Sequence, residues 1–178
     1  MAWSTPITFV AGNVLTASQM NAIQANLSES GPAKATTAGR LLVTTAANAI
    51  DERALSTATT SAAQTTGSTS YTDLTTAGPE VTITTGTSAL VVVSCTMSNN
   101  TAGANAYMGY AISGASTVAA SDDSAFQYAS DPGSGAIHAS SVSKATGLTA
   151  GSNVFTAKYK VTSGTGTWSR RNIIVLGL

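Results

Sequence analysis

The sequence has few charged residues and lacks several features that would assign it to a common class of protein. Eight basic and eight acidic residues make up 9% of its 178 residues, against about 25% in a typical soluble domain. The formal net charge is zero, which argues against nucleic acid as a partner because phosphate binding needs a basic surface. No apolar run approaches the roughly 18 residues of a membrane span, so we expect no membrane partner.

The groups that usually carry enzyme chemistry are also scarce. A lone His138 excludes a two-histidine metal site and weakens any histidine-based triad, and the single Cys95 lies in an apolar stretch typical of a buried thiol. Asp122, Asp123 and Asp131 are explained as turn residues rather than as Ca²⁺ ligands. The interpretation is a protein that is not an enzyme and has no catalytic, cofactor-binding or metal-binding residues and no cofactor.

Hydroxyl side chains take the place of the missing charges. Ser and Thr number 52 together, and the Thr, Val, Ile and Tyr of the C-terminal two thirds favour β-strands. A low-charge, Thr-rich surface is typical of a protein held in an assembly rather than one kept soluble by net charge. The first 17 residues have no positively charged leader, so no secretory signal is expected.

The N-terminal residues 1–27 predict a short helix preceded by an extended apolar stretch. Thr16 and Gln19 have the spacing of a helix-capping box, and Met20, Ile23 and Leu27 follow at helical spacing. So short a helix is marginal alone in water, which predicts that its apolar side chains dock on another protein. The predicted partner-binding residues are Trp3, Ile7, Phe9, Leu15, Met20, Ile23 and Leu27.

Residues 28–66 are mostly Ala, Thr and Ser, which predicts a low-complexity linker. One short strand unit is expected within it: a strand over 40–44, then a turn at 47–49 and residues 50–55, a unit able to pair with a copy of itself.

Residues 67–178 predict an antiparallel β-sandwich of about eight strands, the size of a jelly roll. Apolar residues alternate with polar ones in the clearest strands, as in Val91, Val93, Cys95 and Met97 or in Phe155, Ala157, Tyr159 and Val161. Trp168 is expected to be a strand-end anchor, with salt bridges from Arg170 and Arg171. The expected strands are 68–74, 80–85, 89–97, 106–113, 117–120, 125–129, 136–142, 153–162 and 167–176.

Two parts of the sequence resemble structural proteins of tailed bacteriophages. Residues 3–27 resemble a short N-terminal module of phage tail, fibre and minor structural proteins, through Trp3, Thr5–Phe9, Ala11–Gly12, Val14–Ala17, Met20–Asn21 and Asn26–Leu27. The C-terminal part is similar to the jelly rolls of tumour-necrosis-factor-like or head-fibre domains, through 70–74, 78–79, 112–115, 148–151 and 155–159. The resemblance implies a homotrimer on a virion, anchored by the helix.

The resulting hypothesis is a structural protein of a bacteriophage virion. We expect a capsid or tail decoration or fibre protein, made in the host cytoplasm, that binds phage capsid or tail proteins and displays a trimeric β knob. The alternative is a receptor- or glycan-binding fibre tip, in which Tyr107 or Tyr128 stacks on a host surface glycan.

Overall fold

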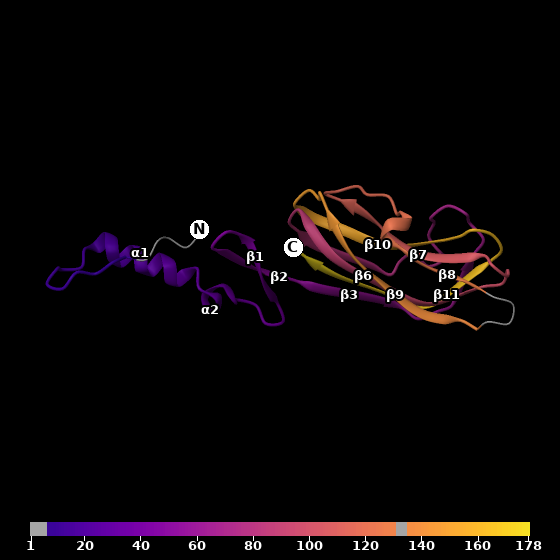
Figure 1. The fold of residues 1–178 in the computed structure, drawn as a ribbon, viewed down its shortest axis with the longest axis horizontal. Coiled ribbons are helices and arrows are strands. Elements are labelled where there is room, and N and C mark those ends of the chain that lie inside the picture. Colours follow the sequence, from indigo (N-terminus) through magenta and orange to yellow (C-terminus); the bar gives the residue numbers. More distant parts are fainter. Residues whose placement is uncertain (1–6, 131–134) are drawn as a thin grey trace. The chain divides into compact units, whose positions relative to one another are not determined.

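The computed structural model describes residues 7–130 and 135–178, in two compact units, Met1–Ala54 (unit 1) and Leu55–Leu178 (unit 2). The molecule is mainly β, with a short N-terminal α-helix (Figure 1). In the described ranges, no helix is both long enough and apolar enough to cross a membrane.

Unit 1 consists of two helices and a β-hairpin. Helix α1 spans Ala17–Ser28, and α2 is the short segment Gly31–Lys34. Strands β1 (Leu41–Ala46) and β2 (Ala49–Arg53) pair antiparallel, with Leu41 opposite Arg53 and Thr44 opposite Ile50. Asn48 lies between them at φ 55°, a conformation that asparagine tolerates in tight turns. The strand unit that the sequence predicts is therefore a hairpin whose two strands pair with each other within the chain.

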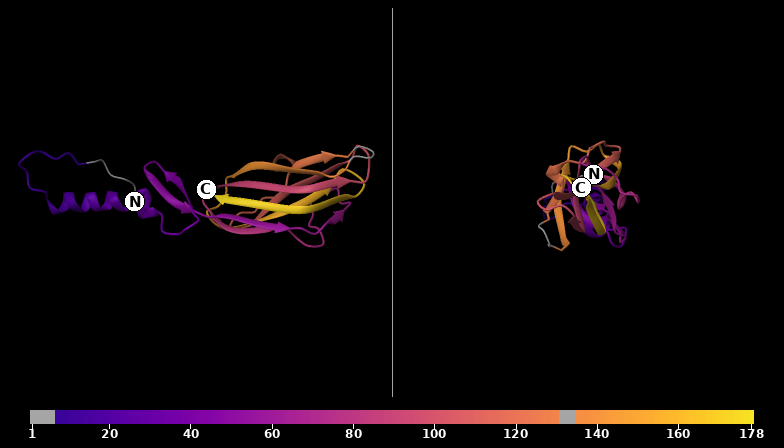
Figure 2. Two further views of the ribbon diagram at one scale, coloured as in Figure 1. Left: turned by 90° about the horizontal axis from the view of Figure 1, so that it is seen from below. Right: turned by 90° about the vertical axis from the view of Figure 1, so that its right-hand side faces the viewer.

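Unit 2 is an antiparallel jelly-roll sandwich, as the sequence predicts. One sheet has the strand order β3-β11-β6-β9, with β4 pairing β11 beyond β3, and the other has the order β5-β10-β7-β8. Eight strands in this order, with connections that cross repeatedly from one sheet to the other, form a jelly roll; its long strands run along the unit (Figure 2, left). The strands are β3 Leu55–Thr60, β4 Gln64–Thr66, β5 Glu80–Thr85, β6 Ser88–Asn99, β7 Asn105–Gly114, β8 Phe126–Ala129, β9 Ile137–Thr146, β10 Gly151–Val161 and β11 Gly166–Gly177.

The core lies between the two sheets and follows the predicted alternation. The β6 residues Val91, Val93, Cys95 and Met97 are all buried, and so are the inward residues of β10. Aromatic side chains fill the centre: the rings of Tyr159 and Trp168 lie 5.4 Å apart between centroids, and those of Tyr110 and Phe155 lie 6.2 Å apart. Such tilted pairs stabilise the core beyond the area they bury.

Strands β3 and β4 lie in residues 55–66, which the sequence assigns to a linker. Strand β3 pairs with β11 from Leu55 opposite Leu176 to Thr60 opposite Arg171. Its small Ala and Thr side chains give no strong apolar alternation, so only the pairing with β11 shows it to be a strand. The sandwich therefore begins at Leu55 rather than at residue 67.

Two segments predicted as strands lie in loops instead. Residues 68–74 and 117–120 each make one isolated bridge, Thr72 with Tyr159 and Val118 with Ile112. Both segments are short of apolar residues that point inward, so they cover the ends of neighbouring strands without extending a sheet.

Arg171 enters the core through an irregularity in β11. The register of β11 against β6 shifts between Ser169 and Asn172, and Arg170 has φ 49°. An extra residue in a strand re-aims the side chains that follow it, and here Arg171 points inward beside Trp168, both with no exposed surface. The predicted salt bridges are wrong for Arg171, because its guanidinium donates to neutral oxygens: the carbonyls of Gly78 (3.0 Å) and Thr76 (3.3 Å) and the Gln64 side chain (3.2 Å).

Candidate attachment surface and surface clefts

The predicted partner-binding residues lie in unit 1, where the described side chains remain open to solvent. Phe9 is 58% exposed, Met20 50% and Leu27 61%. Leu15 is also exposed, Ile7 and Ile23 are half-buried, and Trp3 lies outside the described residues. Within residues 7–54 no residue is buried, so this surface has no core of its own beneath it.

Local hydrogen bonds explain why α1 forms without such a core. The Gln19 backbone N–H donates to the Thr16 hydroxyl (3.3 Å), and the Thr16 backbone N–H donates to the Gln19 side-chain oxygen (2.9 Å). This is the predicted capping box, and it satisfies two backbone donors that a helix start otherwise leaves open. Helix α1 therefore presents Met20, Ile23 and Leu27 on a locally stabilised scaffold.

Unit 1 also exposes apolar side chains that the sequence argument did not include. Val14 is 89% exposed, and Leu41 and Leu42 of β1 are 42% and 44% exposed. Val14 belongs to the same apolar stretch as Leu15, so its position in the sequence was a usable signal. The two leucines lie in a predicted strand whose neighbours cannot be identified from the sequence, so their exposure was not expected.

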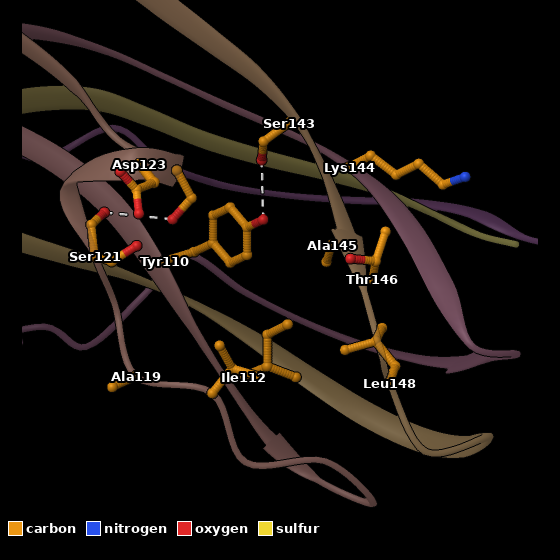
Figure 3. Close-up of a pocket in the computed structure, with 12 residues that line it drawn as sticks. Tyr110, Ile112, Ala119, Ser121, Asp123, Ser143, Lys144, Ala145, Thr146 and Leu148 are labelled. Carbon is orange, nitrogen blue, oxygen red and sulfur yellow. Dashed lines mark hydrogen bonds between the residues drawn. The ribbon is translucent and has the colours of Figure 1, made fainter.

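A first cleft in unit 2 lies between the β9 edge of one sheet and β7 with the loop that follows it (Figure 3). It has a volume of about 220 Å³. The Tyr110 hydroxyl lies 2.9 Å from the Ser143 hydroxyl and joins the two walls. Burial raises the pKa of Tyr110, so this phenol stays protonated and is unsuited to act as a base. The cleft is lined mainly by aliphatic and hydroxyl side chains, among them Ile112, Val118, Thr146 and Leu148.

A second hollow, of about 420 Å³, lies beside β7 and β8 and is lined by Tyr107, Asp122, Ala125, Phe126 and Gln127. It combines two aromatic rings with an amide and a carboxylate. The sequence suggested Tyr107 or Tyr128 as a stacking residue, and only Tyr107 lines the hollow. The sequence analysis considered Asp122 only as a turn residue or Ca²⁺ ligand, because the short 3₁₀ turn that places it beside β7, residues 122–124, leaves no periodic pattern in the sequence. Phe126 was included only as part of the predicted strand 125–129.

An ion pair fixes one wall of this hollow. Lys160 lies between two tyrosines, with its Nζ 4.9 Å from the ring centroid of Tyr71 and 4.6 Å from that of Tyr107. The ammonium contacts Asp122 at 2.7 Å, and the Tyr71 hydroxyl donates to Asp122 at 2.9 Å. Lys160, and then Tyr71, hold the pKa of Asp122 below its usual range. The Asp122 carboxylate is thus ionised, and its negative charge is balanced by Lys160. It remains accessible from the side of the hollow.

The residues considered for catalysis or metal binding are not arranged for either. Cys95 is fully buried, and burial raises the pKa of its thiol. His138 is exposed on the outer face of β9, where its Nδ1 lies 3.0 Å from the Thr96 hydroxyl. Asp131 lies outside the described residues. Within residues 7–130 and 135–178, no group of three or more His, Cys, Asp or Glu side chains is placed to hold a metal ion.

Comparisons with known proteins give little to add to this geometry. No protein-family model matches the sequence, and no curated protein matches it. One similar solved structure is described as "Structure of infectious bursal disease virus Gx strain", with a TM-score of 0.39 and 12% identity. The match covers 75% of this chain and 34% of that one, so this chain spans about a third of the length of its neighbour.

Proposed function

We propose that this chain is a non-enzymatic structural protein of a bacteriophage virion, on the surface of the capsid or tail. Its N-terminal segment anchors it to another virion protein, and its jelly-roll body is displayed as a homotrimer. The protein is made in the host cytoplasm and joins the particle there.

The observation that carries the proposal is the contrast in burial between the two units. Unit 2 buries its large apolar side chains between two sheets, whereas unit 1 leaves Phe9, Met20 and Leu27 half or more exposed with no buried residue among 7–54. Exposed apolar groups that recur within one short segment mark an interaction site. A helix of 12 residues is stabilised chiefly by packing against a partner, which the proposed virion protein provides.

The anchor is tested by the number of copies that purified particles incorporate. Deletion of residues 1–27, and the full-length double variant Phe9→Ser with Met20→Ser, should each lower the copy number at least about tenfold, because each removes apolar area from the contact. Quantitative mass spectrometry of the particles measures this.

The matched control is Val118→Ser, which changes an apolar side chain of similar exposure (44%) in unit 2. It should leave the copy number unchanged. Incorporation of the deletion variant at the wild-type level would show that the anchor lies elsewhere.

A second candidate function is binding of a host surface glycan, and the hollow beside Tyr107 favours it. Sugar rings stack on aromatic faces while their hydroxyls bond to carboxylates and amides, and Tyr107, Phe126, Asp122 and Gln127 offer these groups together. Charge neutralisation of Asp122 by Lys160 suits a neutral sugar.

This candidate predicts that the purified chain binds host cell-wall polysaccharide and that Tyr107→Leu weakens binding at least about tenfold, since stacking is lost. Tyr128→Leu is the control, because Tyr128 lies on the same strand pair but does not line the hollow. Absence of wild-type binding, or equal losses in both variants, would count against glycan binding and leave the structural role.

A further inference from the structure

The outer face of the β3-β11-β6-β9 sheet carries an aliphatic patch on adjacent strands. The register places Leu55, Leu176 and Leu90 side by side in one row across β3, β11 and β6. In the next row Ile174 and Val92 lie beside Val142 of β9. All six side chains point away from the core, since each alternates along its strand with residues that are more buried. We call Leu55, Leu90, Val92, Val142, Ile174 and Leu176 the outer patch.

The outer patch is open to solvent in the single chain. Val142 is 64% exposed, Leu55 56% and Leu90 38%, and the other three side chains are half-buried. Outward positions of a sheet that faces water on one side are normally polar. A contiguous aliphatic surface on such a face marks a contact with another molecule.

The rest of this face carries two cationic side chains and no acidic one among the outward residues of the four strands. Lys144 lies opposite Leu90 on β9, and Arg170 is exposed in β11 at the register shift between Ser169 and Asn172. The other outward positions of these strands are hydroxyl, amide or imidazole side chains: Thr57, Thr59, Ser88, Ser94, Thr96, Ser98, His138, Ser140, Thr146, Thr167, Ser169 and Asn172. The opposite sheet instead carries its ion pairs outward, Lys158 with Asp73 and Lys160 with Asp122.

The outer patch itself has no charged side chain, which suits a second copy of the same chain. A copy presents the same surface, so a contact centred on Lys144 or Arg170 would bring like charges together, whereas one centred on the neutral aliphatic groups of the patch does not. Depletion of charge around an apolar centre is also the composition of interface cores.

The size of the face is adequate for such a contact. Strands β6 and β11 have 12 residues each, so they are about 40 Å long, and four strands are about 19 Å across. Because β3 is shorter, the face offers roughly 600 Å² in projection, close to the ~800 Å² that each partner contributes to a standard interface.

We infer that copies of this chain associate through the outer patch. This inference names the contact surface of the proposed homotrimer and rests on that part of the proposed function. The hydroxyl-rich surround forms the rim, and the charged sheet stays exposed on the outside of the assembly.

Native mass spectrometry and analytical ultracentrifugation of the full chain test the inference. The wild type should have the mass of three chains, and Val142→Lys should raise the dissociation constant on the order of 100-fold, because an unpaired ammonium is buried in the contact. Thr82→Lys is the matched control, since Thr82 is an exposed strand residue of the opposite sheet; it should associate like the wild type.

The possible outcomes test the outer patch as the contact surface separately from the trimeric state and from the N-terminal anchor. A wild-type dimer that Val142→Lys dissociates upholds the outer patch and contradicts the trimer. A monomeric wild type at about 100 µM, far above a micromolar affinity, overturns the inference, as does unchanged association of a folded Val142→Lys variant. If circular dichroism shows that Val142→Lys does not fold, the double variant Leu90→Thr with Val142→Thr removes the patch without adding charge. None of these results depends on attachment to particles.

Discussion

Arg171 is a cation held inside the sandwich without an acidic partner among the described residues. Three neutral oxygens accept from its guanidinium, and the Tyr159 hydroxyl shares one of them, donating to the Gly78 carbonyl at 2.9 Å. The guanidinium carbon also lies 5.4 Å from the centroid of the Tyr159 ring. The two terminal nitrogens of the guanidinium make these bonds, whereas Nε has no hydrogen-bond partner among the described residues. The side chain thereby ties the 76–78 loop and β4 to β11, because a buried charge needs hydrogen bonds to be tolerated.

Arg171→Lys should therefore lower the free energy of unfolding by roughly 1–3 kcal/mol, because an ammonium cannot reach the same set of acceptors and leaves some of them unpaired. Urea denaturation followed by circular dichroism measures the loss. Arg170→Lys is the matched control, since Arg170 is exposed, and should change stability by less than about 0.5 kcal/mol. Equal effects at both positions would show that the buried guanidinium contacts do not stabilise the fold.

At the level of secondary-structure elements, the Glu52 carboxylate connects two parts of unit 1. Glu52 of β2 accepts from the backbone N–H of Thr37 at 2.7 Å, and from the backbone N–H and hydroxyl of Thr36. These bonds hold the segment after α2 against the hairpin. The Thr37 N–H is the main reason why the pKa of Glu52 lies below its ordinary value of 4.5.

A carboxylate whose pKa is lowered by folding stabilises the fold above its unfolded pKa, and that contribution is lost as the pH falls through the folded pKa. The amide signal of Thr37 in NMR spectra should thus stay constant from about pH 7 to pH 5 and shift only below about 4.5. Glu52→Gln should abolish the shift, because an amide does not titrate in this range. A wild-type transition centred above pH 5 would contradict the hydrogen-bonded arrangement.

How far each element could be predicted from the sequence depends on how strong its local pattern is. The capping box at Thr16 and the alternation around Phe155 predicted α1 and β10 correctly, because capping and burial act within a few residues. Strand β3 was missed since its residues are small and hydroxylated, and it is defined by pairing with β11 more than 100 positions later. The outer patch was hidden for the same reason: Leu55, Leu90 and Val142 become neighbours only through the register of the sheets.

At the scale of the whole molecule, apolar surface is distributed unequally along the chain. Unit 2 buries its large apolar side chains between its two sheets, while no residue among 7–54 of unit 1 is buried. A segment with this composition gains most of its stability from a partner. The proposed virion protein covers the N-terminal apolar residues, and the outer patch is covered by other copies, so the two exposed surfaces have different partners.

Electron cryo-microscopy of intact particles would show which molecule covers Phe9, Met20 and Leu27. We expect these side chains to be buried against a different virion protein, with the jelly roll outside that contact. Finding them packed into the sandwich of their own chain, or open to solvent on the assembled particle, would contradict this expectation.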